Sequence, residues 1–84
     1  LILKLDFSDV SPNGTVKDIE HSFHECCNDT YTRFMKKYQH LLQEELVINE
    51  RNSLSTLARL CTCVEFANHR LYVMIGEYDN FANA

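Results

Sequence analysis

An uninterrupted apolar run near the C-terminus, residues 71–75, restricts the fold of this chain more than any other feature. The run reads Leu-Tyr-Val-Met-Ile and contains no charged position. Strands of parallel sheets are covered on both faces and have such runs, whereas half-exposed strands alternate apolar and polar residues. The sequence therefore predicts a strand over 71–75 that is buried on both faces.

Two carboxylates, Glu77 and Asp79, follow this strand after Gly76. In open α/β sheets, ligands bind in the crevice outside the carboxyl ends of the strands, so both acids are candidate site residues. The alternative is a pair of solvated surface acids. A glycosidase-type acid and base pair is disfavoured, because the two acids are only two residues apart and no pocket is evident.

The opening segment predicts a second strand. Residues 2–7 alternate between apolar and polar side chains, which is typical of a strand with one buried face. The apolar members of this alternation are Leu3, Leu5 and Phe7. A proline and an Asn-Gly pair within residues 8–14 then predict a turn.

A long amphipathic helix is predicted over residues 16–45. Thr15 is a suitable N-cap, and Asp18 stands where a capping box usually has Glu or Gln. Apolar residues then recur in steps of three and four and form one stripe, which we expect to pack in the core. The stripe comprises Val16, Ile19, Phe23, Cys27, Tyr31, Phe34, Tyr38 and Leu41 or Leu42.

A second helix is predicted over 54–67, with Ser53 as its N-cap and Asn68 in the left-handed position that often ends helices. The element order is therefore strand, helix, helix, strand. Two strands joined by a helical crossover are most simply parallel, with a right-handed connection. The sequence thus predicts an α/β protein with the order β-α-α-β.

Two strands are too few for an independent sheet with two covered faces. A chain of 84 residues also leaves much of its surface exposed after folding. We therefore expect residues 1–84 to be part of a larger α/β domain, and we expect the isolated chain to be marginally stable.

The charge pattern narrows the range of partners. The chain has a formal net charge of −4, and its lysines and arginines do not cluster along the sequence, so nucleic-acid binding is disfavoured. No apolar run has the length of a membrane span, and no signal peptide is recognisable. These features predict an intracellular chain, cytoplasmic or nuclear, that does not bind a membrane.

The four cysteines form an adjacent pair and a C-x-C within the helical patterns. Reduced cysteines in or near the core are the favoured interpretation. A disulfide between the two pairs would require an oxidising compartment. A zinc site made from His21, His24 and Cys27 would have an unusual ligand spacing. The cysteines are Cys26, Cys27, Cys61 and Cys63.

Residues 73–80, Val-Met-Ile-Gly-Glu-Tyr-Asp-Asn, resemble the Walker B segment of the AAA-ATPase-like family of predicted P-loop NTPases. In that family a run of aliphatic residues precedes Asp-Glu-Tyr-Asp. Residues 3–8, Leu-Lys-Leu-Asp-Phe-Ser, resemble the family's preceding strand, which tends to end in Leu-Asp-Phe-Ser. The resemblance spans the chain, but only its two ends are specific. It implies a fragment of a P-loop NTPase-type domain, in which helices cover both faces of a parallel sheet.

The resemblance also implies roles for individual residues. Glu77 matches the glutamate that polarises the attacking water, and Asp79 matches the family's following aspartate, a tentative cofactor-binding residue. Gly76 stands where the family has the aspartate that holds Mg²⁺, so the Walker B segment is degenerate and no metal ligand is expected. This difference places Mg²⁺-dependent hydrolysis in doubt.

The resemblance implies ATP and Mg²⁺ for the complete domain, and none for this chain alone. The phosphate-binding motif G-x-x-x-x-G-K-[ST] is missing from the sequence, which contains only two glycines, Gly14 and Gly76. In the family this motif precedes the first strand, so we expect it upstream of Leu1. The expected partner is the remainder of the parent domain.

A second interpretation stays open. The chain could be a non-enzymatic α/β module that docks a protein partner through its long amphipathic helix, over residues 16–45. Changes on that helix at Phe23 or Tyr31 would then abolish binding of the partner.

Overall fold

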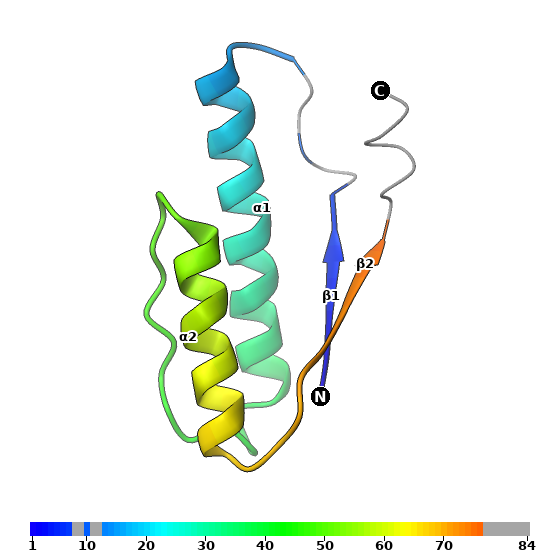
Figure 1. The fold of residues 1–84 in the computed structure, drawn as a ribbon, viewed down its shortest axis with the longest axis vertical. Coiled ribbons are helices and arrows are strands. Elements are labelled where there is room, and N and C mark those ends of the chain that lie inside the picture. Colours follow the sequence, from blue (N-terminus) through cyan, green and yellow to red (C-terminus); the bar gives the residue numbers. More distant parts are fainter. Residues whose placement is uncertain (8–9, 11–12, 77–84) are drawn as a thin grey trace.

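The computed structural model describes residues 1–7, 10 and 13–76, and it shows two helices beside a pair of strands (Figure 1). The predicted α/β arrangement and its β-α-α-β order are confirmed. The elements are β1 (Ile2–Asp6), α1 (Val16–Lys37), α2 (Ser53–Phe66) and β2 (Tyr72–Gly76).

The two strands are parallel, as the helical crossover requires. Ile2 lies beside Tyr72, and the register continues to Asp6 beside Gly76. The backbone nitrogen of Leu1 donates a hydrogen bond to the carbonyl of Arg70 over 2.8 Å, which fixes the start of β1 beside the turn into β2. The carboxyl ends of both strands therefore meet at the same edge of the sheet.

The alternation predicted for β1 is confirmed. Leu3 and Leu5 are buried, while the residues between and beside them are exposed. The strand ends at Asp6, one residue before the predicted end, and the ring of Phe7 stacks on Phe23 with centroids 5.3 Å apart. One face of β1 thus forms the sheet's side of the core.

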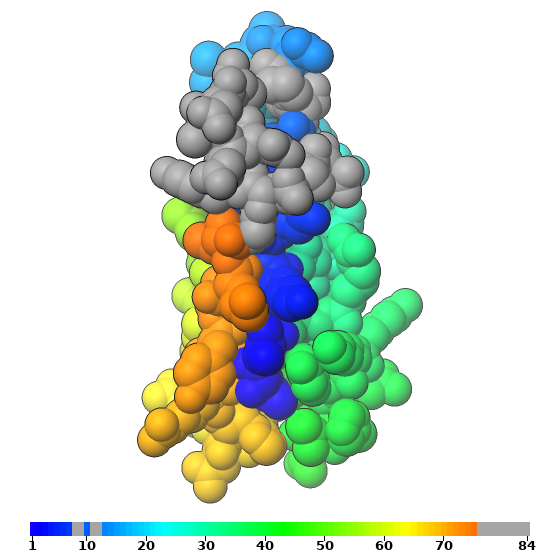
Figure 2. Space-filling model, turned by 90° about the vertical axis from the view of Figure 1, so that its right-hand side faces the viewer, coloured from blue at the N-terminus to red at the C-terminus, as the bar shows by residue number. Residues whose placement is uncertain are grey.

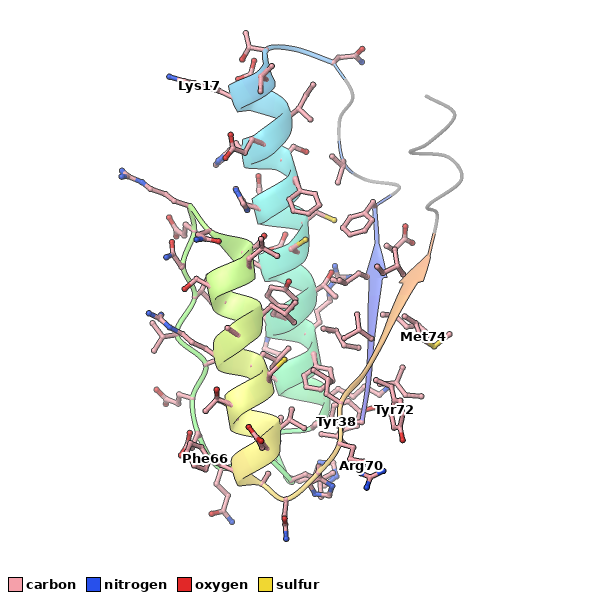
Figure 3. All side chains as sticks on the ribbon, in the orientation of Figure 1. Lys17, Tyr38, Phe66, Arg70, Tyr72 and Met74 are labelled. Carbon is pink, nitrogen blue, oxygen red and sulfur yellow. The ribbon has the colours of Figure 1, made fainter. Side chains whose placement is uncertain are left out.

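The prediction that the strand over 71–75 is buried on both faces is wrong for this chain. Exposure ranges from 44% at Val73 to 60% at Tyr72, with Met74 and Ile75 between these values. The principal neighbour of β2 is β1, whereas α1 packs against β1 and α2. Tyr72 and Met74 lie on the side of the sheet away from the helices (Figure 3). The described chain does not supply the elements that would cover this apolar strand on both faces.

The predicted start of α1 is confirmed. The backbone N–H of Thr15 donates to Oδ2 of Asp18 over 3.0 Å, and the backbone N–H of Asp18 donates to Oγ1 of Thr15 over 3.2 Å. This is a complete capping box. The hydrogen bond from the Thr15 backbone holds the pKa of the Asp18 carboxyl below its usual value.

The predicted helix over 16–45 is too long, because α1 ends at Lys37. The N–H groups of Leu41 and Leu42 both donate to the carbonyl of Tyr38 over 2.9 Å, which turns the chain out of the helix. The turn buries Leu42, which is 4% exposed, in the core. The apolar stripe therefore continues past the helix end, and its periodicity could not reveal the turn.

The start of α2 also differs from the prediction. Asn52, not Ser53, is the N-cap, and its Oδ1 accepts the N–H groups of Leu54 and Ser55, each over 3.2 Å. The predicted end is confirmed, because Asn68 has a φ of 64°. The N–H of His69 reaches the carbonyl of Val64 over 3.1 Å, as in a Schellman motif.

One core joins the elements. Residues from both helices, β1 and the connection after α1 share it: Leu3, Leu5, Cys27, Tyr31, Phe34, Leu42, Leu60 and Val64. In the described part of the chain, neither helix is long and apolar enough to cross a membrane.

Candidate functional site

The carboxyl edge of the sheet is the position where the sequence places the candidate site. Asp6 and Gly76 are register partners at this edge, so the chain leaves both strands at neighbouring points. Glu77 and Asp79 follow Gly76 in the sequence and lie outside the described residues. The predicted catalytic and cofactor-binding roles of these two acids therefore stay predictions.

The described residues bring one carboxylate, Asp6, to this edge from β1. The thiol of Cys26 on α1 donates to the carbonyl oxygen of Asp6 over 3.2 Å, which ties the strand end to the helix. Within the described ranges, no group of three or more His, Cys, Asp or Glu side chains is placed to hold a metal ion.

None of the four cysteines forms a disulfide bond. Cys27 and Cys63 are buried, as the favoured interpretation expects, whereas Cys61 is exposed and Cys26 is half-buried. Burial raises the pKa of the Cys27 and Cys63 thiols. The two buried thiols are therefore protonated at neutral pH and are poor nucleophiles.

A polar cluster between α1 and α2 was not foreseen from the sequence. Nδ1 of His24 accepts the Ser53 hydroxyl over 2.8 Å and the Ser53 backbone N–H over 3.1 Å. Because a backbone N–H donates to Nδ1, this nitrogen carries no proton, and the neutral ring holds its proton on Nε2. Nε2 lies 3.6 Å from Oε1 of Glu20.

Ser53, His24 and Glu20 are the residue types of a hydrolytic triad, but their arrangement does not suit catalysis. Ser53 is 1% exposed, so no substrate reaches its hydroxyl. His24 instead accepts an N–H at the first turn of α2, where helices leave donors without partners. The cluster fastens α2 to α1.

The described structure defines an α/β protein with parallel strands that end at one edge, beside two helices on one side of the sheet. The chain belongs to the AAA-ATPase-like family, because the family model, described as a predicted AAA-ATPase, matches residues 1–84. The resemblance inferred from the two ends of the sequence is thereby confirmed. No curated protein and no solved structure matched the chain.

Proposed function

We propose that residues 1–84 form part of an ATPase domain of the P-loop class, from the strand after the phosphate-binding loop to a degenerate Walker B segment. Family membership supports this assignment, and so does the register that places Asp6 beside Gly76 at the carboxyl edge. In this proposal Glu77 polarises the attacking water and Asp79 contacts the cofactor. Residues 1–84 contain no phosphate-binding motif, and Gly76 offers no side-chain oxygen to a metal ion, so this chain alone neither binds nor hydrolyses ATP.

The exposure of β2 is the observation that most supports a partial domain. Its side chains from Tyr72 to Ile75 are each at least 44% exposed, and its outer edge has no described neighbour. Unpaired apolar edges of this kind promote aggregation unless another element covers them. A further strand and a covering helix, supplied by the rest of the domain, would remove this exposure. In this proposal the chain is intracellular, where a reducing environment keeps its four cysteines as thiols.

The test uses the complete gene product, including any residues that precede Leu1, and a fluorescent ATP analogue with and without Mg²⁺. We expect Gly76→Asp to make analogue binding depend on Mg²⁺. In that background, Glu77→Gln lowers ATP turnover by about 100-fold and leaves analogue binding intact, as loss of a general base does. Glu65→Gln, on α2, is the matched control and leaves turnover unchanged.

If the Gly76→Asp protein neither binds nor hydrolyses Mg-ATP, the proposal is wrong. It is also wrong if Glu77→Gln and Glu65→Gln have equal effects on turnover. The interaction-module alternative is less favoured, because the middle of the apolar stripe of α1 already packs in the core. Tyr31 is 1% exposed, so this face is not available to a partner.

A further inference from the structure

A shallow groove of about 480 Å³ runs between β1 and the C-terminal half of α1. Figure 2 faces this side of the molecule, with β1 in blue between β2 in orange and the green part of α1. The groove lies along the edge of β1 that does not pair with β2. It is therefore separate from the apolar edge of β2, but it reaches the carboxyl end of β1, where Asp6 and Cys26 line it.

The wall that β1 contributes is an unpaired strand edge. β1 pairs only with β2 in the described two-stranded sheet. The N–H of Tyr72 donates to the carbonyl of Leu1 over 2.8 Å, so Leu1 and every second residue after it face β2. The backbone groups of Ile2 and Lys4 consequently face the groove. An edge of this kind is a template for another extended chain.

The groove is cationic in an acidic chain. Three of the chain's eight lysines and arginines line it, Lys4, Arg33 and Lys37, against one of its twelve acids. Among the described residues, the ion pairs found both involve histidine, so these three cations have no carboxylate partner there. Nε of Arg33 donates to a backbone carbonyl over 3.4 Å, and Nζ of Lys37 lies 5.3 Å from the ring centre of Tyr38. Their remaining N–H donors can reach a ligand.

Apolar side chains complete the groove. Ile2 is 48% exposed at its strand end. The rings of Phe34 and Tyr38 lie 4.8 Å apart and line the helix side. The groove thus offers backbone donors and acceptors, cations and an apolar contact within one short length of strand.

We propose that the free edge of β1 binds an extended acidic segment of another polypeptide, which adds a strand to the sheet. The backbone of the segment pairs with Ile2 and Lys4, and its carboxylates meet Lys4, Arg33 and Lys37. A second copy of this chain is a poor occupant, because symmetric pairing through this edge would oppose like charges. β2 carries no charged side chain, so an acidic segment distinguishes the two edges of the sheet.

This interaction does not depend on the proposed ATPase function, and its test contains no nucleotide. The probe is a fluorescein-labelled peptide of four Val-Glu repeats, titrated with the complete gene product and followed by fluorescence anisotropy. A Val-Lys peptide of the same length tests the charge. A Val-Glu peptide that is N-methylated at every residue tests the strand pairing, because methylation removes the N–H donors along both edges. We expect both altered peptides to bind at least tenfold more weakly.

Protein variants locate the site. Arg33→Glu with Lys37→Glu reverses the charge of the helix side of the groove, and both side chains are exposed, so the fold is retained. Lys17→Glu with Lys36→Glu makes the same change of net charge on α1 outside the groove. Lys17 lies at the far end of α1 from Tyr38 (Figure 3). We expect at least tenfold weaker binding for the groove pair and less than a twofold change for the control pair.

Three results would overturn the proposal. Equal loss with both pairs of variants would mean long-range attraction by net charge. Undiminished binding of the N-methylated peptide would exclude strand addition. A dimer seen by sedimentation that is lost with Arg33→Glu and Lys37→Glu would identify a second copy as the occupant. The two altered peptides are tested against the unmodified protein, so these arms do not depend on the folding of any variant.

Discussion

Replacing His24 with phenylalanine tests the fastening of α2 to α1. Phenylalanine keeps the ring and its edge-to-face contact with Phe23, whose centroid lies 5.7 Å away, but it removes Nδ1. Two donors of Ser53, the hydroxyl and the backbone N–H, then lose their acceptor. Each buried donor without a partner costs about 1–3 kcal/mol, so the upper range is about 6 kcal/mol for the pair.

The expected loss is smaller than that upper range. The side chain of residue 24 is 14% exposed, and water admitted at its edge satisfies part of the lost bonding. We therefore expect the free energy of unfolding to fall by about 2–4 kcal/mol. Urea unfolding followed by circular dichroism measures it, with trimethylamine oxide added to keep the baseline folded. His21→Phe, at a position with a 76% exposed side chain, is the control and changes stability by less than about 0.5 kcal/mol.

A double-mutant cycle separates the two donors. Ser53→Ala removes the hydroxyl but keeps the backbone N–H on Nδ1, so alone it costs about 1 kcal/mol. In the His24→Phe background the Ser53 hydroxyl is already without its acceptor, so Ser53→Ala removes an unsatisfied group. The stability loss of the double variant is therefore smaller, by about 1–2 kcal/mol, than the sum of the losses of the two single variants. Strict additivity, or equal losses for His24→Phe and His21→Phe, would refute the reasoning.

Two further predictions concern pH and the exposed strand. The pKa of Asp18 is lowered in the folded chain, so its contribution to stability is present above its ordinary pKa of 3.8 and is lost as the pH falls through the lower folded value. Urea midpoints measured from pH 5 to pH 2 show this loss, and Asp18→Asn makes the dependence shallower. The isolated chain unfolds broadly or aggregates through β2, and Val73→Lys reduces its light scattering. A sharp two-state melt of the monomer above about 60 °C would contradict this expectation.

Local signals allowed some parts of the fold to be predicted. Thr15 with Asp18 and the left-handed Asn68 act through bonds within a few residues, so their residue types were sufficient. The end of α1 was missed because Leu42 lies in the turn after the helix but falls on the same three- and four-residue spacing as the helical apolar residues. Asn52 and Ser53 are both good caps, and only the fold decides which one precedes the helix.

Contacts between distant residues could not be read from local patterns. His24 and Ser53 are separated by 29 residues, and nothing near either one indicates the other. The exposure of β2 depends on which elements cover it, so its composition predicted a burial that the described chain does not supply. The candidate acids Glu77 and Asp79 were found from their place after a strand and from the family resemblance. Their roles await the activity tests.

The parallel register also sets an order of events during folding. Ile2 and Tyr72 are neighbours in the sheet but lie 70 residues apart in sequence. On the ribosome, β1 emerges before both helices and before β2, its partner in the described sheet. The two helices, joined by residues 38–52, can pack before β2 exists, since contacts of short sequence separation form fastest. Until β2 has been made, Lys4 places a charge on the unpaired strand β1, and charged residues on a strand edge discourage pairing with other nascent chains.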